Sequence, residues 1–227
     1  MPQNGVHAIV GTLVRKWMPQ KEWLLLGVVL GNMAPDLDNL VVAYATLAKL
    51  PDPESFHRTF THSIFTILAM LVLFYLIALL TRNEKWKNFG IGFGIGILMH
   101  ILLDLALWFN GVELLWPLDT YELNFWSWFV TPVWLKIFLD TGEFLMFGLY
   151  YLLLGSLAKK QDTDVKRRRS LRTWAILQFT LFILFTLMFF VLGTKGLHYT
   201  LYGGLYLLSL IITIILTIRM RQTVDVL

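Results

Sequence analysis

The chain has 227 residues, of which 57% are hydrophobic and only 15% are charged. Soluble domains carry roughly 25% charged residues, so this composition excludes an ordinary soluble globular domain and indicates an integral membrane protein. The sequence contains no cysteine, which excludes disulfides and thiolate metal sites. The net charge of +4 comes from basic residues that cluster beside apolar segments, a pattern typical of membrane topology signals and not of a nucleic-acid-binding surface.

The N-terminal residues predict a helical hairpin. Two apolar segments, 5–17 and 22–34, flank a proline-containing turn at 18–21. Each arm has about 13 residues and is about 20 Å long, which is short for a membrane span but suits packing inside a bundle. The hairpin brings His7, at the start of the first arm, to the same side as Asp36, which follows the second arm.

Five longer apolar segments follow along the chain. Each reaches the length that a helix needs to cross a hydrocarbon core of about 30 Å. They cover residues 63–80, 89–109, 133–157, 173–192 and 198–218. The predicted fold class is therefore all-α: a polytopic transmembrane helical bundle with an N-terminal helical hairpin and about five long membrane helices.

The charges of the connecting segments predict the orientation. Segments 81–88 and 158–172 are basic, whereas segment 110–132 is acidic and has neither lysine nor arginine. Because basic loops favour the cytoplasm, 110–132 and 50–62 are expected together on the extracytoplasmic side.

Two ionisable residues interrupt the span 89–109. His100 and Asp104 are four positions apart, so their side chains share one face of a helix. A carboxylate at the centre of a bilayer costs about 2.5–3.5 kcal/mol, so both residues are expected to face the bundle interior. They form either a hydrogen-bonded pair that joins two helices or part of a metal site.

The stretch NMAPDLDNL places Asp36 and Asp38 directly after a proline, at the end of the second hairpin arm. One interpretation is a polar turn in which Asp38 or Asn39 caps the next helix. The other interpretation is that both carboxylates join a cluster with the histidines that lie on the same side of the membrane.

The stretch FHRTFTHS at 56–63 holds His57, Arg58 and His62 immediately before a membrane span. The guanidinium of Arg58 offers a fork of donors that matches a phosphate or a carboxylate. The alternative is an interfacial arginine that reaches toward lipid headgroups.

Seven histidine and aspartate side chains are thus expected on one membrane face. Imidazole and carboxylate ligands suit a divalent metal, with zinc as the first choice and manganese or iron as alternatives. At three or four ligands per ion, the set is sufficient for one or two ions. The predicted metal ligands are His7, Asp36, His57, His62, His100 and Asp104. Asp38 and Arg58 are assigned to catalysis.

The order of these blocks resembles the YdjM family. The blocks are His7, PDLD (35–38), HRTFTHS (57–63), HILLDL (100–105) and GVELLWPL (111–118), within roughly residues 5–145. The resemblance implies a bacterial inner-membrane protein, described as LexA-regulated or LexA-binding, and a metal-dependent hydrolase. A more distant likeness to zinc-dependent phospholipase C suggests phosphoester chemistry.

The leading hypothesis is a membrane-bound metal-dependent hydrolase in which a metal-activated water attacks an ester or phosphoester, with a phospholipid as candidate substrate. Asp38 would take the proton, and Arg58 would hold the ester phosphate. The alternative is a non-enzymatic metal-binding, transport or regulatory membrane protein. A conduction route, however, needs polar residues in the inner halves of the spans, and segments 64–80 and 89–99 are almost entirely apolar or glycine.

These expectations divide the chain into three parts. Residues 1–157 form the membrane-embedded hydrolase domain, 158–172 a basic cytoplasmic loop, and 173–227 a C-terminal two-helix membrane anchor. The expected location is the bacterial inner membrane, with the site on the extracytoplasmic face. Membrane lipid is the expected partner, without direct contact to nucleic acid.

Overall fold

The computed structural model describes residues 3–107, 109 and 111–225. These residues are mainly helical, which confirms the predicted all-α fold. Within the described ranges, β pairing is limited to an isolated bridge between Val112 and Leu123. The helices form two compact units: an N-terminal unit from Val10 to Val130, and a C-terminal unit that combines the residues before Val10 with those from Thr131 onward.

The N-terminal unit holds the end of α1 and the elements up to α5. Their bounds are α1 Asn4–Leu13, η1 Val14–Trp17, α2 Leu24–Met33, η2 Pro35–Asp38, α3 Asn39–Leu47, η3 Pro53–Phe56, η4 Phe60–His62, α4 Ile64–Thr81 and α5 Glu84–Leu107. The last two are long and apolar enough to cross a membrane. α2 and the segment Pro35–Leu47 meet at a bend of 42°, as in a broken span or a re-entrant loop.

The C-terminal unit holds the other long helices. Their bounds are α6 Val133–Gln161, α7 Val165–Leu192, α8 Leu197–Arg219 and the short α9 Arg221–Asp225. The first three also meet the length and hydropathy of a membrane span. The five long membrane helices predicted from the sequence are therefore confirmed.

The predicted hairpin arms correspond to α1 with η1 and to α2. Within the N-terminal unit, the end of α1 packs against α2, because a Cβ on Gly11 would lie 3.2 Å from the Cα of Val29 and 3.3 Å from Asn32 Nδ2. A larger residue at this position would push the two arms apart.

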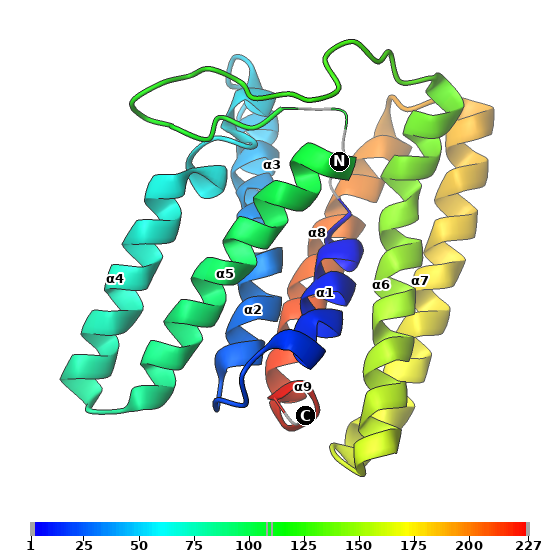
Figure 1. Cartoon of the computed structure of the whole chain (residues 1–227). Coiled ribbons are helices and arrows are strands. Elements are labelled where there is room, and N and C mark those ends of the chain that lie inside the picture. The colour runs from blue at the N-terminus through cyan, green and yellow to red at the C-terminus, as the bar shows by residue number, and fades with distance from the viewer. Residues whose placement is uncertain (1–2, 108, 110, 226–227) are drawn as a thin grey trace. The chain divides into compact units, whose positions relative to one another are not determined.

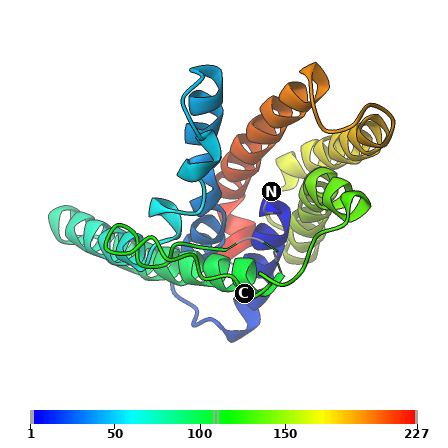
Figure 2. The same cartoon turned by 90° about the horizontal axis from the view of Figure 1, so that it is seen from above.

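The contact between α2 and α5 requires glycine. A Cβ on Gly92 or Gly96 of α5 would collide with the backbone carbonyl of Leu24 or Val28 on α2. Such small-residue contacts let two membrane helices touch along their backbones. Figure 1 shows α5 between α4 and α2, and the view from above shows α3 extending away from the α4–α5 pair (Figure 2).

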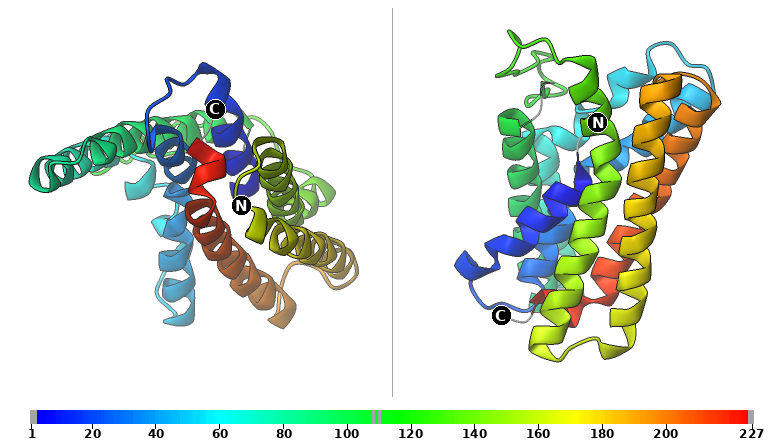
Figure 3. Two further views of the ribbon diagram at one scale, coloured as in Figure 1. Left: turned by 90° about the horizontal axis from the view of Figure 1, so that it is seen from below. Right: turned by 90° about the vertical axis from the view of Figure 1, so that its right-hand side faces the viewer.

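In the C-terminal unit, α6 and α7 lie side by side (Figure 3). Buried hydrogen bonds join α6 to α8: Tyr150 Oη lies 2.8 Å from Thr217 Oγ1, and Tyr151 Oη lies 2.7 Å from Thr213 Oγ1. Interhelical hydrogen bonds of this kind stabilise the association of membrane helices, because the hydrophobic effect does not drive that association within lipid.

The basic segment predicted as a loop is mostly helical. α6 continues to Gln161 and α7 begins at Val165, so residues 162–164 alone connect them. The reason is that Arg168 Nη2 donates to the Ala158 carbonyl at 2.8 Å and thereby satisfies the end of α6. The two compact units divide near residue 131, where α6 begins and packs along α7. The division into parts at residues 157 and 172 stays a prediction.

Candidate metal centre

Seven ionisable side chains that the sequence singled out lie together in the N-terminal unit. Asp36 and Asp38 come from η2, His57 and Arg58 follow η3, His62 ends η4, and His100 and Asp104 lie one turn apart on α5. All are buried except His57, whose side chain is 12% exposed. Three short 3-10 helices and the end of a long helix therefore build this cluster.

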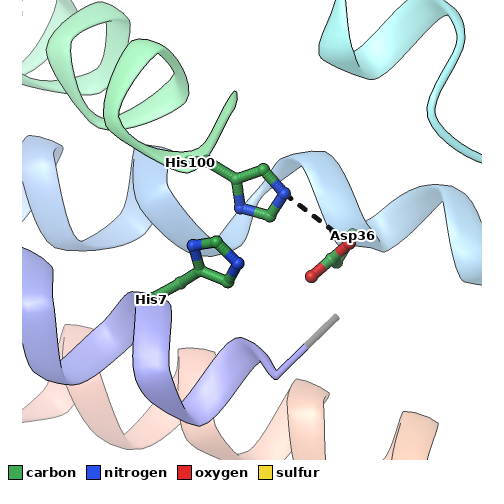
Figure 4. Close-up of side chains that lie close together, drawn as sticks. All are labelled: His7, Asp36 and His100. Atoms are coloured by element: carbon green, nitrogen blue, oxygen red, sulfur yellow. Dashed lines mark ion pairs between the residues drawn. The ribbon is translucent and has the colours of Figure 1, made fainter. Parts of the chain in front are cut away.

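The centre of the cluster holds two imidazole nitrogens and two carboxylate oxygens. His62 Nε2 and His100 Nε2 are 3.0 Å apart. Asp36 Oδ1 lies 3.9 Å from the His62 nitrogen and 3.7 Å from the His100 nitrogen, the latter pair being drawn in Figure 4. Asp104 Oδ2 lies 3.6 and 3.7 Å from the same two nitrogens.

The outer hydrogen bonds of the two rings fix where their protons lie. His100 Nδ1 is 2.8 Å from the carbonyl oxygen of Asn32, which can only accept, so this nitrogen carries the proton. His62 Nδ1 is 2.9 Å from the Thr61 hydroxyl, whose own proton goes to Asp38. His62 Nδ1 therefore donates as well. Both Nε2 atoms direct lone pairs into the centre, which is the tautomer of a metal ligand.

Two nitrogen lone pairs that face each other across 3.0 Å repel unless a proton or a metal cation lies between them. Burial alone lowers the pKa of His62, but the hydrogen bonds and charges of Asp104 and Asp38 outweigh it and raise that pKa. The electrostatics of the centre thus favours a positive charge at this point.

Three of these donor atoms, from His62, His100 and Asp104, lie close enough together to hold one metal ion. Bonds of about 2.1 Å from zinc to nitrogen and oxygen place neighbouring ligands about 3.4 Å apart. The three separations within this group, 3.0, 3.6 and 3.7 Å, bracket that value. The donor set also suits manganese or iron. His62, His100 and Asp104 therefore fit a divalent metal, and an Asp36 oxygen lies near both imidazole nitrogens.

Asp38 lies beside the centre, and both of its oxygens already accept hydrogen bonds. Oδ1 accepts from His57 Nδ1 at 2.8 Å and from Asn39 Nδ2 at 3.3 Å. Oδ2 accepts from the backbone N–H of Arg58 at 3.0 Å and from the Thr61 hydroxyl at 2.8 Å. The alternative role as a helix cap is wrong, because the Asp38 side chain makes no capping bond to α3.

His57 lines the pocket with a ring whose Nε2 is buried. Its Nδ1 proton goes to Asp38, and among the described residues its Nε2 has no hydrogen-bond partner. Burial lowers the pKa of His57, against the opposing hydrogen bond and charge of Asp38. Its ring centroid lies 5.7 Å from that of His62, so its free lone pair is next to the centre.

Arg58 adopts a left-handed backbone conformation, with φ at 63°. Its N–H donates to Asp38, and its carbonyl accepts from the Glu113 N–H at 3.1 Å. These bonds hold a conformation that is uncommon for a non-glycine residue. Its Nη2 lies 3.4 Å from Asp104 Oδ2, while Nε and Nη1 have no partner among the described residues. A buried guanidinium with two unsatisfied nitrogens suits an anion.

A pocket of about 300 Å³ opens onto His57 and Arg58. Residues from the segment after α5, including Gly111, Glu113 and Glu122, form its other wall. Its volume lies at the lower end of the range for small-molecule sites, about 300–1,000 Å³. The pocket thus gives a small ligand access to the side of the cluster where His57 and Arg58 lie.

Sequence reasoning found the ionisable residues but missed the hydrogen-bond partners that orient the two central histidines. Thr61 and the Asn32 carbonyl, which set the tautomers of the two central rings, were given no role. Thr61 could have been noticed because it sits one residue before His62. His7 is buried in α1 but belongs to the C-terminal unit, so its predicted place beside Asp36 stays a prediction.

Comparison with known proteins gives two matches. The model of the YdjM inner membrane protein family matches residues 3–198. The uncharacterized protein YvsG of Bacillus subtilis (strain 168) is 33% identical over 118 residues, a match that covers 50% of this chain and 62% of that relative. No solved structure matches the chain.

Proposed function

The chain belongs to the YdjM inner membrane protein family, and we propose that it is a metal-dependent hydrolase that cleaves a phosphoester at the membrane boundary. The observation that carries this proposal is the pair of Nε2 lone pairs of His62 and His100, which face each other at 3.0 Å between two carboxylates. A proton or a metal cation between the two nitrogens removes their repulsion, and the flanking carboxylates supply the oxygen ligands that a divalent metal takes together with imidazole.

Each residue around the centre is assigned one role in the proposed reaction. A divalent metal bound there would supply an acidified water close to neutral pH. His57 Nε2 is the group placed to accept a proton, because its ring is neutral and Asp38 holds the proton on the other nitrogen. Asp38 is thereby a positioning residue and not the proton acceptor first assigned. Arg58 Nε and Nη1 would hold the ester phosphate.

The surroundings of the pocket support a substrate at the membrane boundary. The segment that follows the pocket exposes large apolar side chains: Leu118 is 80%, Tyr121 70% and Trp128 73% exposed. Aromatic side chains are enriched at membrane–water interfaces. The opposite ends of α4 and α5 carry basic residues, among them Arg82 and Lys87, which favour the cytoplasm. The site would therefore face the extracytoplasmic side.

The packing of α2 against α5 argues against a transport function for this cluster. A conduction route between α2 and α5 would have to pass between these two helices. Their backbones touch at Gly92 and Gly96, where even a Cβ would collide with α2. A one-sided site fits this packing better than a channel does.

Metal content of the purified full-length chain, measured by elemental mass spectrometry, tests the proposal. We expect about one equivalent of zinc, manganese or iron, and less than about half of that in His100→Ala and Asp104→Ala variants. His198→Ala is the matched control, because His198 is exposed and lies in the other unit. Absence of bound metal, also after metals are added back, would refute the proposal.

A second measurement separates an enzyme from a metal-binding protein. The metal-loaded chain is incubated with bis(p-nitrophenyl) phosphate and with phospholipid vesicles, and released products are quantified. Metal-dependent release that the His100→Ala variant lacks supports a hydrolase. Stoichiometric metal without release from any phosphoester would favour the non-enzymatic alternative.

A further inference from the structure

Two glutamates from adjacent chain segments line the wall of the pocket. Val112 and Leu123 exchange both backbone hydrogen bonds, each at 3.0 Å, and form an antiparallel bridge. The bridge brings the segments that carry Glu113 and Glu122 side by side, and the Glu122 carboxylate lies over Gly111. Both glutamates line the pocket, as does Glu54.

This pair of glutamates lacks a cationic partner within the described residues. No lysine occurs between residues 88 and 135, and Arg58 is the sole arginine or lysine of the pocket lining. Glu122 Oε1 accepts from the Gly111 N–H at 2.8 Å, which holds this carboxylate in place without neutralising it. The pocket lining therefore contains three glutamates and a single arginine.

A cation and an anion site thus share one small pocket. Arg58, whose side chain is 6% exposed, lines the pocket and has two nitrogens without a partner among the described residues. Glu113 joins the two sites, because its backbone N–H donates to the Arg58 carbonyl at 3.1 Å. A single short ligand could therefore carry both an anionic group that binds Arg58 and a cationic group that binds the two glutamates.

We infer that the pocket selects a zwitterionic phosphoester of the phosphoethanolamine type. Arg58 takes the phosphate, and the ammonium group lies between Glu113 and Glu122. The ammonium supplies the positive charge that the pair lacks, and charge-assisted hydrogen bonds to carboxylates give the preference. This inference rests on the proposed function for the orientation of the phosphate toward the metal centre.

Binding of two matched soluble diesters tests the inference. Glycerophosphoethanolamine and glycerophosphoglycerol share the phosphodiester but differ in the ammonium group. Titration calorimetry on the full chain in detergent micelles should give a Kd about tenfold lower for the first, as one charge-assisted bond allows. The Glu113→Gln/Glu122→Gln variant should bind both equally. Glu84→Gln, an exposed glutamate at the other end of α5, is the control and should keep the preference.

A second arm identifies the source of the ligand. Vesicles of phosphatidylethanolamine or phosphatidylglycerol are offered to the same three proteins, and bound protein is measured by flotation. If the ethanolamine compound is preferred only when it is presented in vesicles, the inference is supported and the ligand is a lipid headgroup. If the ethanolamine diester is already preferred in solution, the inference is supported and the ligand is a free molecule. Equal affinity in both arms, or a preference that survives the double substitution, overturns the inference. If the hydrolase proposal fails but this inference holds, the protein will prefer the ligand that carries an ammonium group and yet show no metal-dependent cleavage.

Discussion

Replacement of Asp38 by asparagine tests the part of the mechanism that sequence reasoning assigned differently. The carboxylate accepts four hydrogen bonds, at 2.8, 3.3, 3.0 and 2.8 Å. Asparagine keeps one oxygen and gains an NH₂ group, so only two of the four donors can still be accepted. The oxygen satisfies the Arg58 N–H and Thr61 best, which leaves the NH₂ group facing His57 Nδ1.

His57 would then have to move its proton from Nδ1 to Nε2. A base with a protonated Nε2 cannot take a proton from the reacting water, so kcat should fall by about 10²–10⁴. The free energy of unfolding should fall by about 1–3 kcal/mol, the cost of an unsatisfied buried donor. Metal content should stay at one equivalent, since none of the four central donor atoms is changed.

The assay is hydrolysis of bis(p-nitrophenyl) phosphate by the metal-loaded Asp38→Asn variant, with metal content measured on the same sample. Asp119→Asn, the same change in the exposed segment after α5, is the control and should behave like the unmodified chain. Loss of the metal together with activity would mean that Asp38 is a ligand. Full activity would refute the reasoning about the His57 tautomer.

Three further predictions address the anion site, the fold and the orientation. Arg58→Lys removes the planar fork and should lower kcat/KM for phosphodiesters about 10- to 100-fold without loss of metal, as steady-state kinetics would show. Gly96→Leu should abolish the monodisperse peak in fluorescence-detected size-exclusion chromatography, because its side chain collides with the α2 backbone, whereas Gly203→Ala has open space and should be tolerated. Because the chain has no cysteine, single cysteines report topology: a membrane-impermeant maleimide should label Ser55→Cys but not Lys87→Cys in intact cells, and the reverse pattern would place the site in the cytoplasm.

The helices and the ionisable residues of the centre could be predicted because they leave local signals. A span of apolar residues marks a membrane helix, and a four-residue spacing puts His100 and Asp104 on one face. Charged residues in such a setting are costly enough to require partners. These rules need no knowledge of how the helices pack.

The roles within the cluster could not be predicted because they depend on packing. The partner of His100 Nδ1 is a backbone carbonyl of Asn32, and its availability depends on the register between α2 and α5. Asp38 was taken for a base because its sequence does not show how many donors surround it. The proximity of the segments that carry Glu113 and Glu122 likewise depends on a turn that the sequence between them does not specify.

The glycine contact between α2 and α5 has a consequence for ion selectivity. α2 leads directly into Asp36, and α5 carries His100 and Asp104, so the spacing of these ligands is set by helices that cannot slide without a backbone collision. A rigid cage with two nitrogens suits a small ion with bonds of about 2.1 Å and discriminates against calcium, which prefers oxygen ligands at about 2.3–2.6 Å. Gly92 lies about 12 Å along α5 from His100, at 1.5 Å per residue. A substitution there would therefore disturb the same α2–α5 contact as Gly96→Leu and the spacing of the candidate ligands, while leaving every one of those ligands in the sequence intact.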